Sequence, residues 1–438
     1  MATISARTNV GHDAHDTGQA GADRARIDRQ RLLATFDRFA TFGATQGGGL
    51  NRLSLGDADG QARDELCGIA RHQNYRVDID PIGNVFCTRP GRDETLPVVL
   101  VGSHLDSQPF GGRYDGTYGV LAGLEALRSL DDAGATTLRS ITLVDWTDEE
   151  GARFSPSLLG SGVVAGTISL ADALARTDAN GVTVAEELDR LGYCGTFDSP
   201  SLAVHRSFEA HIEQGPVLER TGTDIAVVTG VQAIRWFDVM IAGQDCHAGT
   251  TPHPDRRDAL VAAAGLIEVV DQMARTVQAD LRATVGEIRV QPNSRNVIAG
   301  RVRLAIDLRH PEPSVLDQAE AQLRTAAADI AERRGVTTEV RPVLDMPPTV
   351  FDAGTTELIR STAAGLGYST VEMSSGAGHD SMNVASRAPA SMLFIPCVDG
   401  LSHTEAEDIR DDWAVNGAEV LLGAVRQAAD EPEENDHD

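Results

Sequence analysis

The sequence predicts an α/β protein whose main domain is built on a mostly parallel sheet, with a smaller second domain inserted into it. Four short apolar runs are each followed directly by acidic or imidazole residues, and segments with helical character lie between them. This alternation is typical of buried parallel strands covered by helices. A later stretch instead offers the order βαββαβ, a motif that forms a compact unit by itself.

The ordered chain is expected to begin near residue 26, because residues 1–25 are small and polar. Residues 431–438 form an acidic run and are expected to be a second tail. The tails hold three histidines that we do not expect to bind a functional metal, namely His12, His15 and His437. The first helix is predicted where apolar residues recur at helical spacing, at Leu32, Leu33, Phe36 and Phe39.

The four apolar runs with polar ends are LPVVLVGSHLDS, SITLVDWTDEEG, SFEAHIEQG and SMLFIPCVDGLSHTE. In an open α/β sheet the ligand site lies outside the carboxyl ends of the strands, so we expect these polar residues to line one cavity. Helices are predicted between them over GVLAGLEALRSL and ADALARTDANGVTVAEELDRL.

The second domain is predicted over residues 226–345, where strands and helices alternate as in a ferredoxin-like βαββαβ unit. Strand and polar-end material of the first type resumes after it. The main domain is therefore expected to comprise residues 26–225 and 346–430, with the second domain inserted into it.

The charge balance excludes several functions. All 38 basic residues are arginines, against 65 acidic residues, which gives a formal net charge of −27. A chain without lysine has no Schiff-base, pyridoxal-phosphate or P-loop lysine. So negative a molecule is not expected to bind nucleic acid. Adaptation to high salt and a GC-rich genome both fit this composition.

The five cysteines are scattered and never spaced CxxC, which is typical of reduced thiols in a cytoplasmic protein. No apolar run approaches the roughly 18 residues that a membrane span needs, and the N-terminus lacks the apolar core of a signal peptide. We therefore expect a cytoplasmic protein that does not enter the membrane.

Candidate metal ligands follow the first two runs. His104, Asp106 and Asp115 lie in a Gly-rich stretch whose backbone can bend to point a carboxylate inward. Imidazole and carboxylate suit divalent metals such as zinc and manganese. After the second run, Glu149 and Glu150 follow Asp148, and two of these three acids can divide ligation and proton transfer between them.

His211 and His403 follow the other two runs. Ser402 and Glu405 have the spacing of a capping box, which predicts a helix beginning beside His403. Three histidines and several carboxylates on four converging strand ends favour two metals bridged by a carboxylate over a closed, Cys-rich zinc site. Such a pair can activate water and polarise a carbonyl, which points to hydrolysis.

The motifs resemble those of the hydantoinase/carbamoylase-type amidases, part of the di-metal superfamily of aminoacylases and glutamate carboxypeptidases. The resemblance runs from about residue 30 to about residue 420. In order, the motifs are SHLDSQPFGGRYDG, DWTDEEGARFSPSLLGSG, EAHIEQGPVLE, GQDCHAGTTPH, PNSRNVIAG, DLRH, GAGHDS and LSHTEAE.

The resemblance implies two divalent metal ions per subunit, zinc or manganese, with cobalt and nickel also compatible. It makes Asp115 the bridging carboxylate. It places His104 and His211 on one metal, and Glu150 and His403 on the other.

The resemblance also assigns the residues around the metals. Glu149 matches the general base, and Asp106 matches an acid that orients a metal-bound imidazole. Gln214 matches a residue that contacts substrate near the metals.

In the inserted domain, His247 matches an imidazole that reaches into the partner subunit's site and steadies the oxyanion, which implies a homodimer. Asn296 and Arg309 match the pair that grips the substrate carboxylate, and the backbone of Gly376 is expected to meet the same group. His379 and Asp380, in the same motif as Gly376, stay unassigned.

The expected activity is hydrolysis of the ureido bond of N-carbamoyl-L-amino acids or N-carbamoyl-β-alanine to the amino acid, ammonia and carbon dioxide. Allantoate amidohydrolase is the main alternative, although Gln108 and Tyr114 favour the carbamoyl-amino-acid and β-ureidopropionase branch. A di-metal peptidase or deacylase and a non-catalytic binding protein are further alternatives. The ligand set and Glu149, all present, speak against the last of these.

Overall fold

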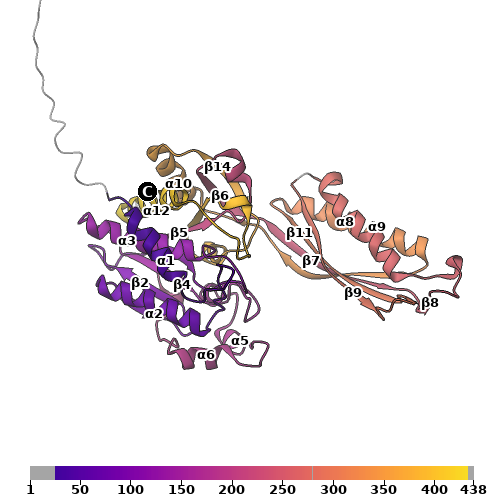
Figure 1. Ribbon diagram of the computed structural model, residues 1–438. Coiled ribbons are helices and arrows are strands. Elements are labelled where there is room, and N and C mark those ends of the chain that lie inside the picture. The colour runs from indigo at the N-terminus through magenta and orange to yellow at the C-terminus, as the bar shows by residue number, and fades with distance from the viewer. Residues whose placement is uncertain (1–24, 279, 433–438) are drawn as a thin grey trace, which may run out of the picture.

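The computed structural model describes residues 25–278 and 280–432. The chain forms a larger sheet with helices on both faces and a smaller sheet that carries two helices and extends to one side (Figure 1). Most of the two predicted tails, with His12, His15 and His437, lies outside the described residues.

The larger sheet has nine strands in the order β1-β2-β4-β3-β5-β15-β6-β13, with β14 also paired to β6. Its strands are β1 (Arg76–Ile79), β2 (Val85–Arg89), β3 (Val98–His104), β4 (Ile141–Trp146), β5 (Val204–Ile212), β6 (Ile225–Val231), β13 (Thr349–Val350), β14 (Thr370–Ser375) and β15 (Ala390–Ile395).

The four apolar runs of the sequence form the centre of this sheet. They are β4, β3, β5 and β15, which are consecutive neighbours, and each neighbouring pair is parallel. Every residue of β3, β4 and β15 is buried, as their continuous apolar character predicts. The carboxyl ends of all four strands therefore lie at one edge, which confirms the mostly parallel α/β fold and the expected convergence.

Helices pack on both faces of the larger sheet. One face is covered mainly by α1 (Arg29–Phe39), α2 (Asp57–His72), α3 (Thr117–Asp132), α10 (Ala353–Leu366) and α12 (Asp411–Asp430). Short helices lie elsewhere on the unit, namely α4 (Leu159–Ala165), α5 (Leu170–Leu174), α6 (Val184–Leu191), α7 (Val217–Thr221) and α11 (Asp380–Ala385). The helical segment expected around α5 and α6 is thus two short helices, because a turn closed by a Thr177–Thr183 bridge separates them.

The smaller sheet and its helices form a unit that we call the inserted unit, residues 233–346. It follows the predicted order, with β7 (Ala233–Ala242), α8 (Ala259–Thr276), β9 (Arg282–Gln291), β11 (Arg301–His310), α9 (Pro313–Arg334) and β12 (Thr337–Met346). The sheet order is β12-β7-β11-β9, wholly antiparallel, and one face packs on α8 and α9 around its own apolar core. A short pair, β8 (Cys246–His247) and β10 (Val297–Ile298), lies at the end farthest from the larger sheet (Figure 1).

The change from one sheet to the other comes later than the sequence suggested. Residues 226–231 belong to β6, which pairs with β15 and β14 in the larger sheet. The inserted unit therefore begins after Val231 rather than at residue 226. Within the described ranges, no helix is long and apolar enough to cross a membrane.

A fully buried arginine links α2 to the strands beneath the site. Arg63 donates to Asp59 Oδ2 at 2.9 Å and to the carbonyl of Gly83 at 2.6 Å, and its guanidinium lies 3.7 Å from Asp145 Oδ2. Asp145 in turn accepts the main-chain N–H of Leu105 at 2.9 Å, one residue beyond His104. Burial raises the pKa of Asp145 to about 7, although Arg63 opposes that rise.

Replacing Arg63 by Met should destabilise the fold strongly, because two buried carboxylates lose their shared cation. Breaking a buried ion pair costs about 3–5 kcal/mol, and the free energy of unfolding from a denaturant titration checks this value. Arg38→Met is the matched control, because Arg38 pairs with Glu65 at the surface. Equal denaturation midpoints for the two variants would contradict the structural role of Arg63.

Candidate metal centre

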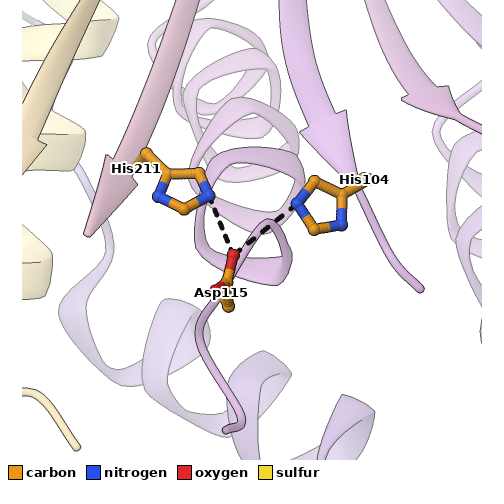
Figure 2. Close-up of side chains that lie close together, drawn as sticks. All are labelled: His104, Asp115 and His211. Carbon is orange, nitrogen blue, oxygen red and sulfur yellow. Dashed lines mark ion pairs between the residues drawn. The ribbon is translucent and has the colours of Figure 1, made fainter. Parts of the chain in front are cut away.

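Asp115 lies at the centre of a cluster of imidazoles and carboxylates at the carboxyl ends of the central strands. One carboxylate oxygen, Oδ1, lies 3.0 Å from His211 Nε2 and 3.7 Å from His104 Nε2 (Figure 2). His104 ends β3, His211 lies next to the end of β5, and Asp115 precedes α3. All three side chains are buried.

The other oxygen of Asp115 faces a second group. Its Oδ2 lies 3.2 Å from His403 Nε2, which is itself 3.6 Å from Glu150 Oε2. Two sets of potential ligands thus share Asp115, one with His104 and His211 and one with Glu150 and His403, and the ligand atoms within each set lie within 4.8 Å of one another. The five residues predicted to bind metal are therefore brought together, with one oxygen of Asp115 for each set.

The donor set fits two divalent ions. His104 Nδ1 donates to the carbonyl of Asp106 at 3.0 Å, and His211 Nδ1 donates to the carbonyl of Ile212 at 2.9 Å. With the hydrogen on Nδ1, each ring presents the lone pair of Nε2 toward Asp115, as a metal ligand must. Imidazole nitrogen and carboxylate oxygen in this number suit zinc or manganese.

The exposure of the two sets differs. The side chains of His104 and His211 are each 1% exposed, whereas that of His403 is 50% exposed. The second set therefore borders the cavity from which a substrate would approach, and the first is closed beneath it.

The protonation equilibria of the cluster are strongly shifted. Burial alone would raise the pKa of Asp115, but the neighbouring imidazoles of His211 and His403 outweigh it and hold that pKa well below its usual range. Burial, helped by Asp115, raises the pKa of Glu150 to about 7. The hydrogen bond with Asp115 raises the pKa of His403 to about 9. Such shifts are typical of functional sites.

The loops that carry the site adopt unusual backbone conformations. Asp148, Gln214 and His403 have φ values of 57°, 55° and 56°, in the left-handed region that side chains other than glycine rarely adopt. Each follows one of the central strands. Backbone strain of this kind persists where the surrounding structure holds a functional side chain in place.

Glu149, the expected general base, lies beside the first set. Its Oε2 is 3.4 Å from His104 Nε2, and its side chain is 9% exposed. Burial raises the pKa of Glu149 well above its usual range, against the opposing effect of His104. A raised proton affinity suits a base that works near neutral pH.

Asp106 contacts both the His104 imidazole and the main chain of the turn that carries Glu149. The nearest acceptor for His104 Nδ1 is the carbonyl of Asp106, at 3.0 Å, and the carboxylate lies farther away at 3.6 Å. The carboxylate instead accepts the main-chain N–H groups of Glu149 and Glu150, both at 3.3 Å. Asp106 thus fixes the turn that carries Glu149 as well as the imidazole of His104.

The capping box expected at Ser402 and Glu405 is wrong. No helix begins there, because residues 401–408 form turns and α12 starts only at Asp411. The Ser402 hydroxyl lies 2.9 Å from Asp115 Oδ2 and 2.8 Å from Glu407 Oε2. The local spacing is satisfied, but the Ser402 hydroxyl contacts Asp115 instead, and the Glu405 carboxylate accepts a hydrogen bond from the Thr45 hydroxyl.

Two supporting residues were missed as such in the sequence. Buried Glu407 accepts the main-chain N–H groups of Tyr114 at 2.8 Å and of Asp115 at 3.1 Å, which fixes the loop before α3. Gln108 donates its main-chain N–H and its side-chain amide to the Glu150 carboxylate, at 3.1 and 2.8 Å. Their positions inside the motifs were the only signal, since both contacts join segments far apart in the chain.

His379 and Asp380, left unassigned, are buried close to the centre. The His379 ring packs edge-on against His211 with centroids 4.7 Å apart, and its Nε2 lies 2.9 Å from Ser375 Oγ. Burial lowers the pKa of His379 well below its usual range, which keeps the ring neutral against its neighbour.

A cavity of about 570 Å³ lies between the metal centre and the inserted unit. Gln214, Arg309, Gly376 and His403 all line it. Gln214 Nε2 donates to Asp115 Oδ2 at 2.7 Å, and Arg309 Nη1 donates to the carbonyl of Gly376 at 2.9 Å. These expected substrate-binding residues therefore line one space beside the candidate metal centre.

His247 and Asn296 lie elsewhere. They are neighbours at the far end of the inserted unit, where Ala248 N donates to the carbonyl of Asn296 at 2.9 Å (Figure 1). Strand β11 runs from that end to Arg309, and at ~3.3 Å per residue it separates the two ends by roughly 25 Å. Within one subunit the structure does not bring Asn296 and Arg309 together.

The environment of His247 fixes the hydrogen on one ring nitrogen. Its Nδ1 accepts the main-chain N–H groups of Gly249 at 3.0 Å and of Thr250 at 3.2 Å, so the neutral ring carries its hydrogen on Nε2. Arg256 holds the loop by donating to the carbonyls of Thr251 and Ala248, at 3.0 and 2.8 Å. The exposed ring is thus prepared to donate a hydrogen bond outward.

Residues 100–427 match the sequence profile of peptidase family M20/M25/M40. An N-carbamoyl-L-amino-acid amidohydrolase from Rhizobium meliloti is 41% identical over 411 residues, which cover 94% of this chain and 99% of the relative. An allantoate amidohydrolase from Bacillus subtilis is 34% identical over 374 residues, or 84% of this chain and 90% of the relative.

One solved structure with a similar fold is also that of an amidase. An amidase of the hydantoinase/carbamoylase family from Burkholderia multivorans matches with a TM-score of 0.89 and 44% identity, covering 93% of this chain and all of that one. The chain therefore belongs to peptidase family M20/M25/M40 and, within it, to the hydantoinase/carbamoylase-type amidases.

Proposed function

We propose that this protein hydrolyses the ureido C–N bond of N-carbamoyl-L-amino acids, releasing the amino acid, ammonia and carbon dioxide. The proposal rests on one arrangement: Asp115 is shared by two potential ligand sets beside Glu149, and Arg309 lines a cavity together with His403 of the second set. Several relatives are named for this activity, among them the one from Rhizobium meliloti.

Glu149 acts as the general base. Two divalent ions held by His104, Asp115, Glu150, His211 and His403, zinc or manganese, supply Lewis acidity and activate water when bound. Glu149 accepts the proton of the attacking water and then delivers it to the leaving nitrogen. Burial keeps the proton affinity of Glu149 high enough for both steps, against the opposing effect of His104.

Arg309 recognises the substrate carboxylate. A guanidinium presents a planar fork of donors that matches a carboxylate. One Nη of Arg309 is anchored on the carbonyl of Gly376, which places the guanidinium on the metal side of the cavity. An uncharged substrate would lose the charge-assisted hydrogen bond to this group, so amides should be poor substrates.

His247 and Asn296 serve the active site of a second subunit. Both lie roughly 25 Å along the sheet from Arg309, at ~3.3 Å per strand residue, too far to act in their own site. In a symmetric homodimer the inserted unit would act as lid and dimerisation domain, and His247 Nε2 would donate to the oxyanion of the partner's substrate.

We place the enzyme in the cytoplasm. The five cysteines are all unpaired, and three of them, Cys67, Cys87 and Cys397, are buried. Reduced thiols of this kind are typical of that compartment.

Ammonia release on a panel of substrates tests the activity. Protein loaded with zinc or manganese is given N-carbamoyl-L-amino acids, N-carbamoyl-β-alanine and allantoate in parallel. We expect the highest kcat/KM for an N-carbamoyl-L-amino acid. Preference for allantoate, the reaction named for the Bacillus subtilis relative, would replace the substrate but keep the chemistry.

Glu149→Gln should abolish turnover, because the amide cannot accept the proton of water. A loss of about 10²–10⁴-fold in kcat is expected for a general base. Metal content, measured by plasma mass spectrometry, should stay at the wild-type value, because Glu149 is outside both ligand sets.

His211→Ala is the matched control for that variant, because it should lower both activity and metal content. Metal lost from Glu149→Gln as well would make Glu149 a ligand. Retained turnover by Glu149→Gln would show that Glu149 is not the general base.

Mixing two inactive variants tests the shared active site. His247→Ala and Glu149→Gln subunits, unfolded together and refolded or co-expressed, should form mixed dimers in which one site keeps both residues. About a quarter of wild-type activity is expected, because half of the dimers are mixed and each holds one intact site of two. Activity no higher than that of the separate variants would show that His247 does not act across a dimer.

A further inference from the structure

Four side chains of the inserted unit form a patch on the wall of the substrate cavity. In the register of β11 with β9, Arg309 lies directly opposite Arg282, and Asp307 lies opposite Thr284. Directly opposite residues, and residues two apart on one strand, point to the same face of a sheet. All four line the cavity, on the sheet face opposite to the one that buries Ile306 and Leu308 against the helices.

The two arginines of this patch differ in their partners. Arg309 pairs with Asp307, whose two oxygens lie 2.7–3.0 Å from its Nε and Nη2. Arg282 donates only to the main-chain carbonyl of Asp280, at 3.1 Å, and no carboxylate pairs with it within the described part of the chain. The charge of Arg309 is therefore compensated and that of Arg282 is not.

The arrangement is unfavourable without an anion. Like charges directly opposite on neighbouring strands destabilise a sheet. Asp307 compensates one of the two, and the other acid on the cavity wall, Glu213, accepts the first main-chain N–H groups of α7 at 2.7–2.8 Å. Arg282 thus lies exposed in a substrate cavity with its charge available.

The rest of the wall carries several polar side chains. Gln214, Gln232 and Thr284 contribute amide and hydroxyl groups, and the apolar side chains on the wall are only those of Ala377 and Leu401. Polar groups of a substrate side chain can therefore find hydrogen-bond partners on this wall. A polar side chain with a negative charge would satisfy both the wall and Arg282.

We propose that Arg282 binds a second carboxylate of the substrate, so that the preferred substrates are N-carbamoyl derivatives of acidic amino acids. This proposal rests on the proposed carbamoyl hydrolysis. Arg309 holds the carboxylate common to all substrates of the class, next to the metal centre. Arg282, its neighbour across the strands, holds the carboxylate of the substrate side chain and discriminates acidic from neutral substrates.

Matched substrates measure this discrimination. N-Carbamoyl-L-aspartate and N-carbamoyl-L-asparagine have nearly the same shape and differ in one charge, and N-carbamoyl-L-methionine adds an apolar side chain. We expect wild-type kcat/KM to be at least about tenfold higher for the aspartyl than for the asparaginyl compound, as one charge-assisted hydrogen bond provides. A preference for either neutral compound would overturn the proposal.

Variants of Arg282 separate binding of the side chain from a general role. Arg282→Gln should lower kcat/KM for the aspartyl compound about 10- to 100-fold and leave the two neutral compounds within about twofold. Arg282→Lys should keep part of the preference, because the charge remains. Arg289→Gln is the control, since Arg289 lies on the same strand but pairs with Glu287 outside the cavity.

An equal loss on all three substrates would overturn the assignment, because Arg282 would then bind the common carboxylate or support the fold. The melting temperature of Arg282→Gln separates these two causes. It should not fall, since the substitution removes an unfavourable pair of like charges.

Binding to metal-loaded Glu149→Gln protein distinguishes this proposal from the proposed activity. Isothermal titration with the aspartyl and asparaginyl compounds should show tighter binding of the former by about tenfold or more, and no difference after Arg282→Gln is added. This result would support the anion site even if the wild type hydrolysed no carbamoyl compound. Equal affinities would overturn the anion site whatever the activity.

Discussion

The carboxylate of Asp115 is the interaction on which the rest of the site depends. Its two oxygens face two different ligand sets, with His211 at 3.0 Å from Oδ1 and His403 at 3.2 Å from Oδ2. A carboxylate in this position can bridge two cations and hold them close enough to act on one substrate. The imidazoles of His211 and His403 hold the pKa of Asp115 well below its usual range, against the effect of its burial.

The fold fixes the position of the Asp115 carboxylate. Four parallel strands end at one edge of the sheet and place candidate ligands there. Asp115 precedes α3, which packs on the same strands. Glu407 fixes its main chain and Ser402 contacts its side chain, while Gln108 and Asp106 fix the neighbouring Glu150. The inserted unit contributes Arg309 and three neighbouring side chains to the cavity beside that edge.

The sequence could predict the strand ends because continuous apolar runs and the polar residues after them are local patterns. It predicted five metal-binding residues through motifs at those ends, and the structure brings these five side chains together. The helix expected at Ser402 failed because a capping box describes local spacing, whereas the hydroxyl is used in a contact with Asp115, 287 positions away in the chain. The same holds for Gln108 and Glu407, whose partners are set by tertiary packing alone.

The separation of Asn296 from Arg309 could not be predicted from the motifs either. The two motifs that contain these residues are adjacent in the sequence and do not show that a long strand separates them in space. The patch of Arg282 and Arg309 became visible only from the register of β11 with β9. Residues that act through cross-strand pairing, or through a second subunit, leave no local pattern for the sequence to show.

Anomalous diffraction from crystals of the metal-loaded protein tests the shared role of Asp115 most directly. Data collected at the absorption edge of the bound metal locate each ion independently of the protein. We expect two peaks per subunit, roughly 3.5–4 Å apart, with one Asp115 oxygen bound to each. A single peak, or two ions of which Asp115 binds only one, would contradict this expectation.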